Sequence, residues 1–487
     1  MNHPRCQHVV VIGAGLAGLA AAEAVVRGTS ANAAGCRVTL IEASGRVGGI
    51  VATERRDGWL IERSADSFLA ARPEAVGLVE RLGLAGELIG VDPRVRRALV
   101  LHNGRPQPVP AGFRLLAAGR MASILTTPLL TPLGRLRLLG ERMVPRRAAG
   151  MADESLEHFA VRRLGREAFE RLVQPLASGI WTADPARLSM AAACPEFFAM
   201  ELRDGSLSAG ERRRMRSAAL NETAAGARYG QFLTLASGME TIPRRLADSL
   251  ASRGVQQLTA AVTELSLRPD HVWEVRLRAA AAAPAVIEAD AVILALPAMA
   301  AASILRICHQ PLSEALAAIE YAGSAVVSLG FAREDVVHPL NAAGLVVPRC
   351  ERRRILAVSF SSEKFPGRAP AGSVLLRTFV GGALDPQTAL LDDEQLVDLV
   401  REELRDVLGA RGTPQIVQID RWLGAMPQYT VGHVERVKAI RSLVAQRRGL
   451  ALAGAAYEGV GIPQVIASGQ SAAALVSEVL DSTKMPF

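Results

Sequence analysis

The apolar pattern at the start of the chain predicts a strand, a glycine turn and a helix, in that order. β-Branched residues fill positions 9–12, glycines follow at 13, 15 and 18, and helix-forming residues continue from Leu19. The uninterrupted apolar run ends at Glu23, whereas a helix that spans a bilayer needs about 20 apolar residues. A secretion signal with incidental glycines is the alternative, but such a signal does not require this order of elements.

The spacing of these glycines is typical of a dinucleotide-binding turn, in which a helix follows a buried strand. The first glycine makes the tight turn, the second lets the backbone approach a pyrophosphate, and the third lets the helix pack on the strand. The N-terminus of the helix then faces the phosphate charge. The predicted cofactor contacts in this turn are Gly13, Ala14, Gly15, Leu16, Ala17 and Gly18.

Later apolar patterns extend the same fold. The alternation in residues 36–42 predicts a second strand that ends in Glu42, where this fold places an acid for a ribose hydroxyl. Residues 28–35 before it predict an enlarged turn. Further patterns predict a hairpin over 260–277, a strand and helix over 290–305, and a buried strand, glycine-rich loop and helix over 449–476. The nucleotide-binding domain is therefore expected to combine the start, the middle and the end of the chain.

Composition sets the class of protein and narrows its partners. With 487 residues, 49% of them hydrophobic, the chain can form two or three domains with substantial cores. The formal charge of +8 suits anionic partners, but the basic residues lack interleaved aromatics, so nucleic acid is not expected. The five cysteines and eight histidines show no metal-ligand or disulfide spacing, so we expect no metal and a reducing, cytoplasmic setting.

The segment after the second strand distinguishes a flavin from a nicotinamide cofactor. EASGRVGG, residues 42–49, supplies a glycine pair for close backbone approach and an arginine that can offset phosphate charge. With Thr53 it resembles the FAD-dependent amine oxidase superfamily. The resemblance implies FAD, held in part by Glu42, Ala43, Arg46, Gly48 and Gly49, with Val262 at the adenine end.

Four segments resemble one family of that superfamily, the oxygen-dependent protoporphyrinogen and coproporphyrinogen III oxidases. They are ERSADSFLAAR (62–72), ESLEHFAVRRLGREAFERLVQPLASGIWTADPARLS (154–189), WLGAMPQYTVGHVERV (422–437) and YEGVGIP (457–463), which span nearly the whole chain. The chain departs from the family pattern at Ser64 and Ala65 (usually Gly-Pro), at Trp181, Thr182 and Ala183 (usually Tyr-Ala-Gly), and at Gln464 (commonly Asp).

The resemblance also implies where the flavin ring and the substrate lie. Further FAD contacts are expected from Ser64, Ala65, Asp66, Ser67, Trp422, Val460, Gly461 and Ile462. Arg72 is the expected contact for a substrate propionate, with a solvated surface arginine as the alternative. Ile180, Trp181 and Met239 are expected on the macrocycle, with core packing as the alternative; Tyr429 either lines the pocket or closes a core. No residue is assigned as a catalytic base.

The implied fold is α/β, with a discontinuous Rossmann-like FAD-binding domain, a mixed-sheet α+β substrate domain and a helical domain. The predicted division is 1–75, 226–305 and 421–487 for FAD, 76–225 for the helical and substrate region, and 306–420 for substrate. The implied reaction oxidises a porphyrinogen to a porphyrin in haem synthesis, with O2 leaving as peroxide. An amine oxidase, a carotenoid desaturase and a non-catalytic flavin-binding scaffold are the alternatives. A homodimer and hand-over of the product to the next haem-pathway enzyme are left open.

Residues 110–147 are basic and apolar in alternation. The segment contains seven arginines and one acidic residue, Glu141, and leucine, isoleucine and methionine lie between them. The pattern predicts amphipathic helices, broken at Pro128 and Pro132, that lie peripherally on an anionic membrane. The alternative is a helical lid whose arginines guide propionates inward. The sequence does not decide between the two.

Overall fold

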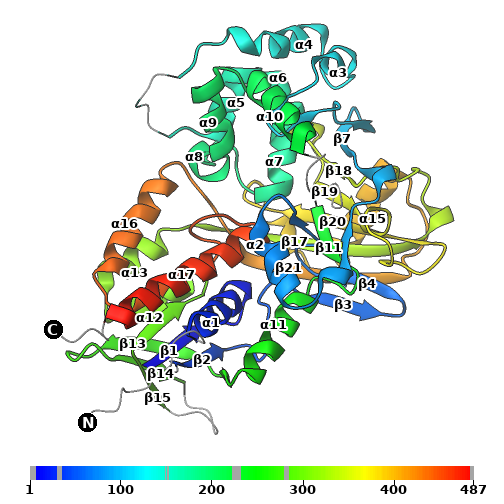
Figure 1. Cartoon of the computed structure of the whole chain (residues 1–487). Coiled ribbons are helices and arrows are strands. Elements are labelled where there is room, and N and C mark those ends of the chain that lie inside the picture. The colour runs from blue at the N-terminus through cyan, green and yellow to red at the C-terminus, as the bar shows by residue number, and fades with distance from the viewer. Residues whose placement is uncertain are drawn as a thin grey trace.

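The computed structural model describes residues 7–29, 36–147, 150, 153–221, 232–278 and 285–482. Most of the turn predicted at 28–35, and the predicted boundary at 225/226, lie outside these residues. Figure 1 shows a sheet between helices near the two chain ends, a second sheet beside it, and a group of helices above both.

A parallel sheet collects strands from the beginning, the middle and the end of the chain. Its order is β12-β2-β1-β16-β22, with bounds Gln256–Thr259, Cys36–Glu42, Gln7–Ile12, Ala291–Leu294 and Leu450–Leu452. The middle residues of the three central strands are buried because both faces of the sheet are covered. The strands predicted at 9–12 and 36–42, and the strand predicted at the start of 290–305, are therefore confirmed.

Helices and a small antiparallel sheet cover the two faces of this parallel sheet. On one face lie α1 (Leu16–Thr29), α2 (Pro73–Arg81), α11 (Thr241–Ser252) and α17 (Ile462–Ser482). On the other lie α12 (Ala298–Leu305), α13 (Gln310–Ala317), α16 (His433–Ala445) and the strands β13 (Val262–Leu267), β14 (Trp273–Leu277) and β15 (Val286–Ala289). A β-carbon on Gly469 would collide with the carbonyl oxygen of Ala17, so α17 packs on α1 at backbone distance.

A seven-stranded mixed sheet forms the second layer. Its order is β21-β17-β20-β19-β18-β7-β8, with bounds Ile416–Pro427, Tyr321–Ala332, Ser373–Gly381, Ile355–Phe360, Gly344–Val346, Ala98–His102 and Arg105–Pro108. Helix α15 (Asp393–Leu408) covers one face through Leu396, Val400 and Leu404. Strand β21 crosses the predicted 420/421 boundary, so Trp422 lies in this sheet. The division into domains stays a prediction.

Short strands join the two layers. They are β3 (Thr53–Arg56) with β4 (Trp59–Glu62), and β5 (Phe68–Leu69), β11 (Phe232–Leu235) and β6 (Leu88–Gly90) in a three-stranded sheet. Helix α14 (Ser361–Lys364) follows β19. The turn between β4 and β5, residues 63–67, therefore stands between the parallel sheet and the seven-stranded sheet.

The helices above the sheets have a core of their own and form a helical lobe (Figure 1). They are α3 (Met121–Thr126), α4 (Pro132–Leu139), α5 (Leu156–Leu164), α6 (Arg166–Ala168), α7 (Gln174–Trp181), α8 (Met190–Ala193), α9 (Pro195–Asp204) and α10 (Leu207–Asn221). Fully buried Glu141 accepts hydrogen bonds from Arg163 and from the Leu207 amide, 2.9 Å away. This carboxylate caps α10 and ties it to α5.

The helices predicted over residues 110–147 begin later than the pattern indicates. Residues 113–118 form a hairpin of β9 (Phe113–Arg114) and β10 (Ala117–Ala118), and helix starts only at Met121. Arg114 points into the lobe, where it binds Glu196 at 2.7 Å and Glu211 at 3.1 Å. The acidic partners come from α9 and α10, so a local charge count missed them. Among the described helices, none combines the length and hydropathy needed to cross a bilayer.

Candidate cofactor and substrate site

The glycine turn after β1 leaves open space at only one of its three glycines. Gly13 has a φ of 101°, and a β-carbon there would collide with the Ala295 carbonyl. A β-carbon on Gly18 would collide with the Gly13 carbonyl. At Gly15, by contrast, the nearest heavy atom would be the Gly49 α-carbon at 4.0 Å. The protein's own packing thus requires Gly13 and Gly18, whereas Gly15 is the glycine at which this type of turn lets a pyrophosphate approach the backbone.

The second glycine pair runs alongside this turn. The Gly48 amide donates to the Ala14 carbonyl at 2.8 Å, and Gly15 and Gly48 form a parallel bridge. Arg46 braces the loop by donating to the Val51 carbonyl at 3.3 Å and to the Gly49 carbonyl. Its side chain remains 40% exposed, so the guanidinium can still reach a phosphate on the open side.

Glu42 holds the turn from the end of β2. Its Oε2 accepts from the Ala14 amide at 2.8 Å, and its Oε1 accepts from the Ser44 amide and hydroxyl, each at 2.8 Å. A carboxylate has about four lone-pair sites, so acceptor capacity remains for a ribose hydroxyl. Ala43 beside it is exposed, and Val262 is half-buried at the start of β13.

A second helix N-terminus lies at the same edge of the parallel sheet. Helices α1 and α17 follow β1 and β22, and helices that follow parallel strands begin at the strands' carboxyl edge. The loop before α17 is tied by the Tyr429 hydroxyl, which donates to the Ala455 carbonyl and accepts from the Gly459 amide at 2.8 Å. Of the predicted contacts here, Val460 and Gly461 are half-buried and Ile462 is buried.

The loop at residues 63–67, which carries four predicted FAD contacts, is fastened to the seven-stranded sheet. The Trp422 indole donates to the Arg63 carbonyl at 2.8 Å, and the Arg63 guanidinium pairs with Asp420 at 2.5 Å. The Ser64 carbonyl accepts from Arg377, and the Ser64 hydroxyl donates to the Ile50 carbonyl at 2.5 Å. These bonds join the predicted ring contacts Ser64 and Trp422 through one backbone segment.

Asp66 in this loop is an ionised carboxylate between two cations. Lys364 Nζ lies 3.0 Å from each of its oxygens, and Arg377 Nη1 lies 3.3 Å from Oδ2. Burial acts to raise the pKa of Asp66, but Lys364 and Arg377 outweigh burial and hold that pKa well below its usual range. The Ser67 hydroxyl also donates to Asp66 at 2.7 Å. The loop is thus held by charge as well as by backbone hydrogen bonds.

The four predicted substrate contacts have very different surroundings. Arg72, before α2, is exposed and makes no hydrogen bond or ion pair with the described residues, so it can receive an anion. Ile180 is 48% exposed at the end of α7, whereas Trp181 is buried in the lobe's core. Met239 has no exposed surface, so contact with a macrocycle would require the core to rearrange.

Sequence reasoning missed the residues that brace the loop from the seven-stranded sheet. Lys364, Arg377 and Asp420 follow the loop by about 300 residues or more and carry no motif. The only sequence signal is polar character inside apolar strands, as at Arg377 within SVLLRTFVG. A buried charge in such a strand indicates a partner but does not identify it.

Replacing Gly15 with alanine should remove FAD and leave the fold intact. The added β-carbon meets no protein atom closer than 4.0 Å but enters the space in front of the turn. We expect at least about tenfold weaker FAD binding, which is about 1.4 kcal/mol, in a flavin-fluorescence titration, with an unchanged circular dichroism spectrum. Gly18→Ala is the contrasting variant and should lose folded protein. Normal flavin affinity in Gly15→Ala would contradict the assignment.

Replacing Asp66 with asparagine should destabilise the protein, because Lys364 and Arg377 would lose their shared carboxylate. Breaking a buried pair by removing one partner costs roughly 3–5 kcal/mol, so the thermal unfolding midpoint should fall by several degrees. Glu402→Gln is the matched control, since its pair with Arg405 is exposed on both sides and exposed pairs contribute roughly 0–1 kcal/mol. Equal unfolding midpoints for the two variants would contradict the conclusion that Lys364 and Arg377 hold the loop through the charge of Asp66.

Comparisons with known proteins agree with this geometry. The family model for flavin containing amine oxidoreductase matches residues 16–477. The chain is 34% identical to a coproporphyrinogen III oxidase of Bacillus subtilis, over 96% of this chain and 97% of the relative. It is also 34% identical to a coproporphyrinogen III oxidase of Propionibacterium freudenreichii, over 98% of this chain and 91% of the relative.

A solved structure extends the likeness from sequence to fold. The structure is from Exiguobacterium sp. 255-15 and is provisionally named a protoporphyrinogen oxidase. The two chains are 30% identical in sequence, and their structures match with a TM-score of 0.82. The match covers 98% of this chain and 99% of the other chain. These matches show that the chain belongs to the flavin-containing amine oxidoreductase family.

Proposed function

We propose that this protein oxidises coproporphyrinogen III to coproporphyrin III in haem synthesis, with FAD as the electron acceptor and O2 as the final oxidant. The observation that carries the proposal is 34% identity, over nearly the full length of both chains, to proteins named coproporphyrinogen III oxidase. The open backbone at Gly15 and the bracing of residues 63–67 support FAD binding at these two segments.

The reaction removes six hydrogens from the macrocycle in three two-electron steps, and each step passes two electrons to one O2, which leaves as peroxide. Bound FAD would supply the hydride acceptor, while the protein binds and orients the reactants. Gly15, Arg46 and Glu42 would hold the pyrophosphate and ribose. The 63–67 loop, Trp422 and the loop before α17 would hold the ring.

The substrate side of the proposal rests on charge and exposure. Coproporphyrinogen III carries carboxylate side chains, and Arg72 offers an exposed guanidinium that no described carboxylate occupies. A guanidinium can bind a carboxylate through two parallel hydrogen bonds. Exposed Ile180 offers apolar surface near the end of α7. We assign the parallel-sheet part and Trp422 to FAD, and we assign Arg72, the lobe and the rest of the seven-stranded sheet to the substrate.

Anaerobic mixing of the flavin-loaded protein with coproporphyrinogen III tests the function. We expect the flavin absorbance to bleach, because the substrate transfers hydride to FAD. Porphyrin fluorescence should appear only once air is admitted, because full oxidation removes six electrons and one FAD accepts two. Protoporphyrinogen IX should bleach the flavin more slowly, and a primary amine should leave it unchanged. Bleaching by the amine alone would favour an amine oxidase, and bleaching by none of them would reject the reaction while leaving the family membership intact.

We further propose that the protein works in the cytoplasm and docks on the membrane surface through the tip of the lobe. This α3–α4 tip exposes Leu125, Leu133, Leu136 and Met143, with exposed fractions of 56, 76, 67 and 85%. Arg142 and Arg146 beside it are exposed as well. Apolar side chains beside basic ones suit the interface of an anionic bilayer, and Figure 1 shows α3 and α4 at the outer end of the lobe.

The double variant Leu133→Glu/Leu136→Glu should lose membrane binding and keep its flavin. The two leucines lie three residues apart on α4, so both face the same side, and the new charges would oppose insertion and repel anionic lipid. Sedimentation with phosphatidylglycerol vesicles measures the effect. Leu475→Glu, at a leucine on α17 that is 55% exposed, is the control. A wild-type protein that stays in the supernatant at low salt would support the lid instead.

A further inference from the structure

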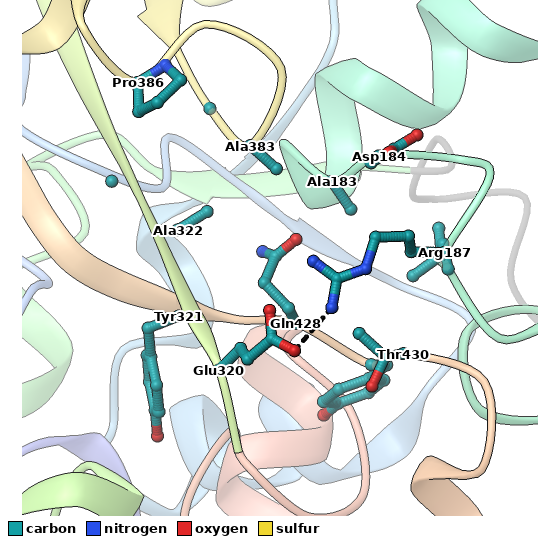
Figure 2. A pocket seen from close by; sticks show the side chains of 14 residues that line it. Ala183, Asp184, Arg187, Glu320, Tyr321, Ala322, Ala383, Pro386, Gln428 and Thr430 are labelled. Atoms are coloured by element: carbon teal, nitrogen blue, oxygen red, sulfur yellow. Dashed lines mark hydrogen bonds and ion pairs between the residues drawn. The ribbon is translucent and has the colours of Figure 1, made fainter. Parts of the chain in front are cut away.

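A small pocket opens where the end of α7, the start of β17 and the end of β21 meet (Figure 2). Its volume is about 230 Å³. Arg187 and Glu320 face each other across it in an ion pair of 2.5 Å, and their side chains are 56% and 52% exposed. Its lining combines small residues, among them Ala183, Gly323 and Ala383, with polar side chains such as Asp184 and Gln428.

The inner wall of this pocket is shared with the segments predicted to hold the flavin ring. Tyr429 lines the pocket, and its hydroxyl binds the Ala455 carbonyl and the Gly459 amide in the loop before α17. Gly323 also lines the pocket, and a β-carbon there would lie 3.1 Å from the α-carbon of Leu423, the residue after Trp422. Two ring-facing segments therefore lie directly behind the pocket.

The seven-stranded sheet is irregular beside the pocket. The register between β17 and β21 shifts between Ala322 and Ser324, which marks a β-bulge. At the end of β20, Gly381 and Gly382 have φ values of 90° and 80°, which favour glycine. Bulges occur often beside active sites, where they redirect the backbone. Small residues at the bulge and at the end of β20 leave room for the pocket beside Tyr321 and Gln428.

The size of the pocket selects its occupant. Pockets for drug-sized ligands span roughly 300–1,000 Å³, so a pocket of about 230 Å³ excludes a tetrapyrrole. Dioxygen and hydrogen peroxide both fit. The alanines and glycines of the lining suit apolar dioxygen, and its polar side chains, among them Arg187, Glu320 and Gln428, suit peroxide, which hydrogen-bonds strongly.

We propose that this pocket is a passage for dioxygen toward the reduced flavin and for hydrogen peroxide away from it, separate from the entrance of the macrocycle. The proposal rests on the proposed function, in which O2 is the oxidant. In the step it serves, dioxygen takes two electrons and two protons from the reduced flavin and leaves as hydrogen peroxide. A separate passage lets dioxygen reach the flavin while the macrocycle occupies its own side.

Filling the pocket with Ala383→Phe tests the passage. Ala383 is exposed and its side chain points into the pocket (Figure 2), so a phenyl ring occupies the pocket without entering the core. The holoenzyme is reduced with dithionite and mixed with oxygenated buffer in a stopped-flow instrument. We expect reoxidation at least about fivefold slower than in wild type. Gln387→Phe, exposed on the same loop outside the pocket, should match wild type.

Two further readouts separate this proposal from the function on which it rests. Flavin reduction by coproporphyrinogen III should keep its wild-type rate in Ala383→Phe; slower reduction with normal reoxidation would assign the pocket to the macrocycle and overturn the passage. Xenon occupies small apolar cavities, so pressurised crystals should show xenon here in wild type and none in the variant. Equal reoxidation rates also overturn the passage, even where no porphyrinogen reduces the flavin.

Discussion

The cofactor half of the molecule depends on two backbone stretches that lie side by side with no side chain between them. Gly15 and Gly48 form a bridge, and the Gly48 amide donates to the Ala14 carbonyl at 2.8 Å. Glu42 fixes the same turn by accepting from the Ala14 amide. Helix α1 can begin at Leu16 because the turn is set, and α17 packs on α1 at Gly469. The positions of both helix N-termini follow from this contact.

The loop at residues 63–67 fixes the position of the seven-stranded sheet relative to the parallel sheet. Its carbonyls accept from Trp422 on β21 and Arg377 on β20, and its carboxylate Asp66 binds Lys364 on α14. Burying charges is costly unless each is paired, and here one carboxylate faces two cations. A loop held this way has little freedom to move, which suits the role we propose for it, the presentation of its backbone to a flat ring.

Features that local chemistry decides could be predicted from the sequence. The glycine turn, the strand ending in Glu42, the hairpin at 260–277 and the helix from about Pro463 all follow from spacing and periodicity, and the structure has them. Features that distant partners decide could not. Arg114 resembles the other arginines of its segment until α9 and α10 supply Glu196 and Glu211.

The residues of the candidate site also fall into those that the sequence predicts and those that it does not. Gly15, Glu42 and Arg46 lie within one stretch of chain, so their grouping is visible in the sequence. Arg377 and Asp66 are far apart in the chain, and only the packing of the 63–67 loop on the seven-stranded sheet brings them within 3.3 Å. The exposure of the predicted substrate contacts could not be foreseen either, because nothing in the sequence distinguishes exposed Ile180 from fully buried Met239.

The order of strands in the parallel sheet has a consequence for synthesis of the protein on the ribosome. Strand β1 ends at residue 12, but its neighbour β16 begins at residue 291, and the edge strand β22 begins only at residue 450. Domains usually fold as units, the N-terminal one first, during synthesis. Here the parallel sheet that contains β1 is complete only after β22 has been synthesised. The glycine turn is therefore synthesised long before its sheet can form. Flavin capture is thus a late event, and a chain that stops short of α17 lacks one wall of the site.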